Sequence, residues 1–219
     1  MGKDASEPSA PLDIETRSFE IIEAEVPEPR PFQGREWAVV RRMIHASADF
    51  ELLRLVRFHP EAVSRGLEAL KNSCSIVTDT QMTKAGITSA RMDRLGCTLA
   101  CHLSEPEVAR RAGAENRTRS AVAVEWALEG LDGGIYVVGN APTALFELLE
   151  QIGRHGLAPA LVVGMPVGFV GAAEAKEALM NQSEAPFVSL TGRKGGSALA
   201  AACVNALAEL ALEPEEESL

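Results

Sequence analysis

Short apolar segments alternate with amphipathic segments along most of this chain of 219 residues. The apolar segments are rich in β-branched side chains, which is typical of strands that are buried on both faces. Five strands are predicted, at Ser75–Thr78, Cys97–Cys101, Ile135–Val138, Ala160–Val163 and Phe187–Leu190. Helical spacing is found at Arg35–Met43, Pro60–Lys71, Glu105–Gly113, Arg119–Glu129, Pro142–His155, Ala172–Asn181 and Ser197–Leu210. This alternation predicts an α/β fold, a three-layer, doubly wound, Rossmann-like domain with a mainly parallel sheet of about five strands.

The two ends of the chain differ in composition from this alternating part. Residues 1–13 are rich in serine, proline and charge, and predict a disordered extension. Residues 14–212 predict a single domain, which is long enough to bury a core without disulfides or structural metal. Residues 213–219 form an acidic tail.

The composition excludes several classes of function. A formal charge of −10 disfavours binding to nucleic acid or to an anionic membrane, and an aromatic content of 5% disfavours base stacking. No apolar run reaches the roughly 18 residues of a membrane span, and the N-terminus lacks the apolar stretch of a signal peptide. Cys97 and Cys101 lack a second pair at zinc spacing, so buried thiols are favoured over a metal site. We therefore expect a cytoplasmic protein.

Three segments rich in glycine follow predicted strands, namely Gly139–Ala144, Gly164–Gly171 and Thr191–Ser197. Each can be an ordinary turn, since glycine is common wherever φ is positive. Three of them at the carboxyl edge of one sheet favour a broad site for a large, anionic ligand. In the first segment, backbone amides at the start of a helix, together with Thr143, could bind an anion.

Common sequence fingerprints are absent from the chain. It has neither the Walker pattern nor a GxGxxG turn after the first strand, which disfavours a nucleotide-binding Rossmann domain. It also lacks an HExxH motif and a GxSxG elbow, so we expect neither a protein-bound metal nor a serine nucleophile.

His45 is the candidate for proton transfer, because histidine titrates near neutral pH. Arg41 and Arg42 precede it, and Asp49 follows at a spacing that could orient the ring. Taken alone, a histidine at a helix end is more often structural than catalytic. Thr118 and Arg119 at a predicted helix start are open to two interpretations, a helix cap or donors to a carboxylate. Arg91 and Arg94 can also be interpreted as part of a helix face that is exposed to solvent.

Seven segments together resemble the precorrin-8X methylmutase family, in family order from about residue 16 to 210. They are TRSFEIIEAE at 16–25, RMIHASADFE at 42–51, TDTQMTKAGI at 78–87, NRTRSAVA at 116–123, GNAPTALFELLE at 139–150, PALVVGMPVGFVGAAEAKEAL at 159–179 and GRKGGSALAAACVNAL at 192–207.

The resemblance implies an isomerase of cobalamin biosynthesis that moves a methyl group from carbon 11 to carbon 12 of a corrin precursor. It assigns the role of proton donor to His45, and it implies a homodimer with sites at the subunit interface. No cofactor is implied, because any cobalt is carried by the substrate. The residues assigned to substrate binding are Ser18, Arg91, Thr118, Arg119, Asn140, Thr143, Gly168, Arg193 and Lys194. The segment GAAEAK departs from the usual GAAESK by one hydroxyl, at Ala175.

Details of three segments favour the branch of the family that acts on cobalt-precorrin-8 and gives cobyrinic acid. They are ASADFE after His45, TDT before Gln81 and GRKGGS at 192–197. The alternatives are the metal-free reaction from precorrin-8X to hydrogenobyrinic acid, and a corrinoid-binding carrier without turnover. The apolar stretch Met165–Val170 can lie at the subunit junction, under the macrocycle or in the core.

Overall fold

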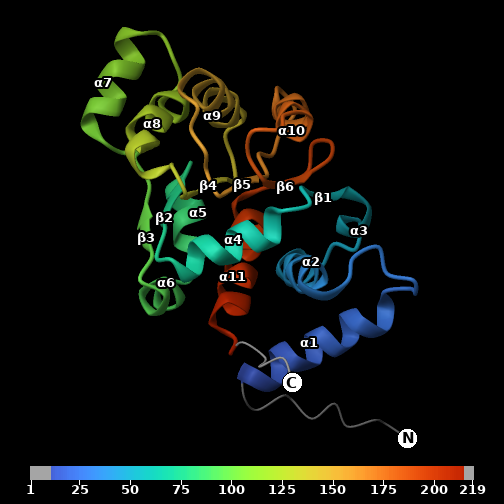
Figure 1. Ribbon diagram of the computed structural model, residues 1–219. Helices are drawn as coiled ribbons and strands as arrows, with labels where there is room; N and C mark the ends of the chain where they lie inside the picture. Colours follow the sequence, from blue (N-terminus) through green and yellow to red (C-terminus); the bar gives the residue numbers. More distant parts are fainter. Residues whose placement is uncertain (1–10, 215–219) are drawn as a thin grey trace, which may run out of the picture.

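A computed structural model describes residues 11–214 of the chain, and its centre is a six-stranded sheet (Figure 1). The strands lie in the order β1-β6-β5-β4-β2-β3, and all neighbours are parallel except β1 and β6. Their bounds are β1 Val56–Phe58, β2 Ser75–Thr78, β3 Thr98–Ala100, β4 Ile135–Val138, β5 Leu161–Gly164 and β6 Phe187–Leu190. The predicted α/β fold with a mainly parallel sheet is confirmed.

Helices cover both faces of this sheet and complete three layers (Figure 1). One layer holds α7 (Pro106–Ala114), α8 (Arg119–Ala127), α9 (Pro142–His155) and α10 (Ala172–Asn181). The other holds α2 (Gly34–Ser47), α4 (Ala62–Lys71), α5 (Gln81–Gly86), α6 (Ser89–Leu95) and α11 (Ser197–Leu212). Helix α1 (Pro11–Glu25) packs on the outer side of α2, and the short α3 (Leu52–Leu55) leads into β1. A 3₁₀ turn, Leu128–Gly130, ends α8.

Alternating side chains of the strands build a separate core on each face of the sheet. In β4 all four residues are buried. Ile135 and Val137 belong to the core under α2, α4 and α11, whereas Tyr136 and Val138 belong to the core under α8, α9 and α10. A strand with apolar neighbours on both sides has no polar face, which explains the continuous apolar runs in the sequence.

The observed elements differ from the predicted ones mainly at the N-terminal side. Helices α9 and α10 have the predicted bounds, but the sheet has one strand more than predicted, β1. Only three residues long, β1 pairs antiparallel with β6 at the edge, so it has too little periodicity to be predicted. Helix α1 begins at Pro11, inside the extension predicted to be disordered. Residues 1–10 of that extension, and 215–219 of the acidic tail, lie outside the described residues.

The strand order places the chemistry-bearing loops at one edge. β2 is followed in the chain by β3 on one side, whereas β4, β5 and β6 extend the sheet on the other. The carboxyl ends of β2, β4, β5 and β6 therefore meet at the same edge, where ligands bind in open parallel sheets. Within residues 11–214, no helix is both long and apolar enough to cross a membrane.

Candidate functional site

His45 lies in the last turn of α2, and its ring is half-buried. The helix ends at Ala48, which adopts the left-handed conformation and donates its N–H to the Ile44 carbonyl. The Phe19 ring of α1 meets the imidazole edge-on, with 5.2 Å between ring centroids. Neither imidazole nitrogen has a hydrogen-bond partner among residues 11–214. A structural histidine normally uses its nitrogens for hydrogen bonds, whereas this ring is held by packing.

A cluster of three charges lies directly after this helix. The Lys194 Nζ atom is 2.5 Å from Asp49 Oδ2 and 2.5 Å from Glu51 Oε2. The hydrogen bond from Lys194 holds the pKa of Asp49 below its usual value, and the same bond raises the pKa of Lys194. The expected contact of Asp49 with the His45 ring is therefore not found, because the carboxylate faces Lys194 instead.

The Lys194 loop is bonded through its backbone to the loop that follows β5. Gly196 donates its N–H to the Met165 carbonyl at 2.9 Å, and Gly168 donates its N–H to the Arg193 carbonyl at 3.2 Å. The Arg193 guanidinium lies over the Phe169 ring, 5.5 Å from its centroid, and Arg193 is exposed. The two loops thus form one surface, which presents Arg193 and Lys194 at the carboxyl edge of β5 and β6.

A second group of predicted residues gathers at the starts of α8 and α9. The Thr118 and Thr143 hydroxyls form a hydrogen bond of 2.9 Å, and Thr118 also caps α8 by accepting the Ala121 N–H. Arg119 and Asn140 are exposed beside them. Thr118 and Arg119 line a hollow of about 500 Å³. No hydrogen bond or ion pair within the described residues joins this group to the one around His45.

The backbone amides between β4 and α9 already have an anionic partner, the side chain of Asp79. Its carboxylate accepts the N–H groups of Gly139, Asn140 and Ala141 at 2.8–3.0 Å, and the Thr83 hydroxyl at 3.1 Å. Asp79 is 1% exposed. The prediction that these amides bind an anionic ligand is therefore wrong, because a buried carboxylate of the protein occupies them.

The side chains of Ser18 and Arg91 bond to neither group. The Ser18 hydroxyl donates to the Ile14 carbonyl of its own helix at 2.7 Å, although its neighbour Phe19 contacts His45. Arg91 donates to the Thr88 hydroxyl at 2.8 Å and forms an ion pair with Glu209 near the far end of α11. Arg91 therefore has a structural role, whereas Ser18 directly precedes Phe19, the residue that packs on His45.

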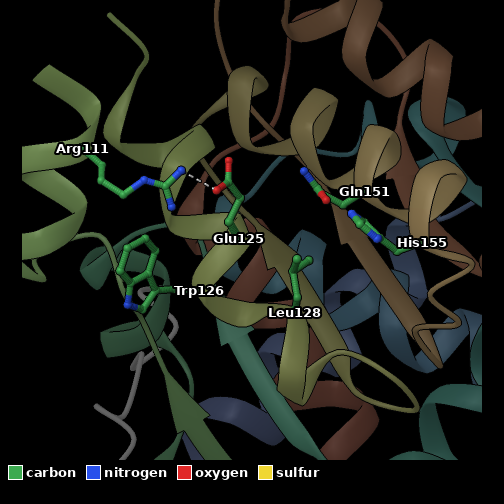
Figure 2. A pocket seen from close by; sticks show the side chains of 6 residues that line it. All are labelled: Arg111, Glu125, Trp126, Leu128, Gln151 and His155. Carbon is green, nitrogen blue, oxygen red and sulfur yellow. Dashed lines mark hydrogen bonds and ion pairs between the residues drawn. The ribbon is translucent and has the colours of Figure 1, made fainter. Parts of the chain in front are cut away.

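A hollow of about 680 Å³ lies between α7, α8 and α9, away from the carboxyl edge (Figure 2). Figure 2 shows Arg111 from α7 joined to Glu125 of α8, while Gln151 and His155 project from α9. Arg111 also pairs with Glu115, and the Gln151 amide donates to Glu147. Arg111, Glu125 and Gln151 therefore already have bonding partners within the protein.

Three residues of the site region were missed by the sequence analysis. Phe19 and Asp79 lie inside the segments TRSFEIIEAE and TDTQM. A single phenylalanine or aspartate in such a segment does not by itself indicate a functional residue. Lys176 is fully buried, and a signal for it existed: Ala172, Ala175, Lys176 and Leu179 have the spacing of one buried helix face.

Comparisons with known proteins agree on one family. Residues 13–210 match the Precorrin-8X methylmutase family. A cobalt-precorrin-8 methylmutase of Salmonella typhimurium is 44% identical, with 90% of this chain and 94% of the relative covered. A precorrin-8X methylmutase of a Sinorhizobium species is 43% identical, with 89% and 92% covered. The crystal structure of a precorrin-8X methylmutase from Thermus thermophilus superposes with a TM-score of 0.85 at 47% identity, covering 91% of this chain and 96% of that one. This chain belongs to the precorrin-8X methylmutase family and is an isomerase of the methylmutase type.

Proposed function

We propose that this chain moves a methyl group from carbon 11 to carbon 12 of cobalt-precorrin-8, giving cobyrinic acid, with His45 as the proton donor. The observation that carries the proposal is the position of His45, whose ring packs on Phe19 and has no hydrogen bond among the described residues, in the last turn of the helix that precedes the Asp49 and Glu51 contacts with Lys194. Protonation of the conjugated macrocycle makes the sigmatropic shift easier, and general acid assistance typically contributes about 10²–10⁴-fold. The methyl group stays on the substrate, so no donor and no resident cofactor take part.

The charges of the carboxyl edge suit a corrin precursor. Such a macrocycle is flat and carries several carboxylates, which need an apolar surface and donors around it. Exposed Arg193 and Arg119 provide cations, and Thr118 and Thr143 provide hydroxyls. Lys194 has two acidic partners in this structure, so it meets a substrate carboxylate only in competition with Asp49 and Glu51.

The cobalt-containing substrate is favoured by the segments ASADFE, TDT and GRKGGS. Relatives named for either substrate have similar identities to this chain, 44% and 43%, so overall similarity does not choose between them. We propose that cobalt enters the site only as part of the substrate.

A direct test presents the purified protein with cobalt-precorrin-8 and with precorrin-8X and follows the visible spectrum. We expect conversion of cobalt-precorrin-8 with the larger kcat/KM. Equal values for the two substrates would reject the cobalt preference. A spectral change of binding without product formation would support the carrier alternative instead.

We further propose that the protein acts as a homodimer whose second subunit completes the site. Phe169 and Val170 are 84% and 89% exposed, and Phe146 and Val167 beside them are 42% exposed. Exposed apolar patches on a soluble chain favour a partner, and two-fold pairing is the most common way to cover them. Among the described residues, no hydrogen bond or ion pair joins Arg119 and Thr118 to the group around His45, which also supports a shared site. Of the stretch Met165–Val170, Met165 and Pro166 belong to the core, so only its later residues are available for contact.

Subunit mixing tests the shared site. Arg119→Ala is expected to weaken corrinoid binding by about 1–3 kcal/mol, the scale for one charge-assisted hydrogen bond. When Arg119→Ala subunits are mixed with His45→Ala subunits, we expect mixed dimers to recover turnover, because one of their two sites is intact. Light scattering checks the oligomer, and labelled subunits check exchange. Exchange without recovery would mean that each subunit contains a complete site.

A further inference from the structure

Lys176 is a lysine inside the protein that the proposed chemistry does not use. It lies on α10, is 0% exposed and faces the sheet together with Ala172, Ala175 and Leu179. Burial lowers the pKa of its amine to about 8, and no carboxylate forms an ion pair with it in residues 11–214. A buried ammonium without a counter-ion costs several kcal/mol, so a side chain kept at this cost is expected to serve a purpose other than folding.

Within the described part of the chain, this amine has one polar partner, a backbone carbonyl of the site. Lys176 Nζ donates a hydrogen bond to the Lys194 carbonyl at 2.5 Å. The side chain of the same Lys194 reaches in the other direction, to Asp49 and Glu51 in the turn after His45. A continuous chain of contacts therefore leads from the inside of α10, through residue 194, to the end of the helix that carries His45.

The loop that carries the Lys194 carbonyl is held by backbone contacts rather than by side chains of its own. A Cβ atom at Gly195 would lie 2.3 Å from the Met165 carbonyl oxygen and 2.7 Å from that of Pro166, so only glycine fits there. Two backbone hydrogen bonds, at Gly168 and Gly196, flank this contact. With glycines at 192, 195 and 196, the loop has few side chains of its own to fix its conformation.

We propose that Lys176 is a positioning residue of the methyl-shift reaction, whose amine fixes the Lys194 carbonyl and so holds Arg193 and Lys194 in place next to the turn that follows the His45 helix. It touches neither substrate nor reacting atoms, and acts through the 191–196 loop. The inference rests on the function proposed above. Its effect falls on substrate binding, because the loop presents the cations that meet substrate carboxylates.

The test replaces the amine by an apolar group of similar length, Lys176→Met. We expect KM for cobalt-precorrin-8 to rise roughly 10- to 100-fold, the scale for misplaced binding groups, with a smaller change in kcat. We expect the thermal unfolding midpoint to stay the same or rise, since the buried charge is gone. Glu177→Gln, on the exposed side of the same helix, is the matched control and should leave KM, kcat and the midpoint unchanged.

A second variant keeps the test valid if Lys176→Met fails to fold. Gly195→Ala moves the same carbonyl without touching the lysine, and it should give the same rise in KM. Unchanged KM in either variant would overturn the proposal. A fall in kcat alone would also overturn it, since the amine would then belong to the chemistry. The proposal would also be overturned if substrate affinity and kcat both fell in proportion to a lower thermal unfolding midpoint. That result would assign Lys176 to folding.

Binding of the product separates this proposal from the proposed function. Cobyrinic acid is titrated into wild type and Lys176→Met, and the visible spectrum gives both dissociation constants. Wild type that neither binds cobyrinic acid nor turns over would refute the proposed function. Wild type that does both, with equal affinity in the variant, would refute the role of Lys176 alone.

Discussion

His45→Ala is expected to fold and to bind corrinoid but to lose turnover by about 10²–10⁴-fold, the usual contribution of a positioned general acid. The imidazole makes no hydrogen bond in the described structure, and its main partner is the edge of Phe19. Removing it therefore breaks no polar network and leaves only a small gap at a half-exposed position. Turnover by visible spectroscopy, affinity for cobyrinic acid and thermal unfolding should be measured on the same preparation.

His59→Ala is the matched control for this result. The His59 ring is also half-buried and packs edge-on against an aromatic ring, Phe187, with 5.8 Å between centroids. Its Nδ1 atom, however, accepts the Glu61 N–H at 3.2 Å, as expected of a structural histidine. We expect this variant to keep its turnover and to lose a little stability. Wild-type turnover in His45→Ala, or its failure to fold, would contradict the acid role.

Asp79→Ala is expected to lower the free energy of unfolding by about 3–5 kcal/mol, because it leaves buried donors without an acceptor. Three backbone amides and the Thr83 hydroxyl donate to this carboxylate, which lies at the positive end of α9. Urea unfolding monitored by circular dichroism measures the loss.

Asp132→Ala is the matched control, because it removes an aspartate that is exposed rather than buried. Its carboxylate accepts one backbone amide, that of Ala158 at 3.1 Å, and it is exposed. We expect a loss of at most about 1 kcal/mol, the scale of one exposed hydrogen bond. If Asp79→Ala were no more destabilising than Asp132→Ala, water or the substrate would have to satisfy the amides, and the carboxyl edge of β4 would again be a candidate anion site.

The fold was accessible from the sequence because its strands and helices have strong periodicity. β4 and β6 are short apolar runs, and α9 and α10 have clear amphipathic faces, so their bounds were predicted correctly. β1 was not predicted because three residues at an edge carry no usable pattern. α1 was not predicted as a helix because it packs through few residues, such as Phe19 and Ile22, and leaves Ile14 and Ile21 exposed.

The site was less accessible, because its contacts join residues far apart in the chain. His45 and the cations could be selected from segment resemblance, but the pairing of Asp49 with Lys194 spans 145 positions. Helical spacing predicts that Asp49 and His45 lie on the same face of one helix. However, α2 ends at Ala48, so Asp49 does not lie on the helix face that carries His45. Likewise Asp79 and the amides of Gly139–Ala141 meet only because β2 and β4 are neighbours in the sheet.

The two backbone hydrogen bonds between the loops after β5 and β6 have a consequence for how tightly the product is held. A loop that becomes ordered on binding loses conformational entropy, and this loss weakens affinity. The Gly168 and Gly196 bonds already reduce that freedom, so under the proposed function less of the interaction with a corrin would be lost in ordering these loops. Substrate and product of a methylmutase are isomers that share one macrocycle and its carboxylate arms, so both gain from this preorganisation. Product is then expected to bind about as tightly as substrate and to compete with it for the site.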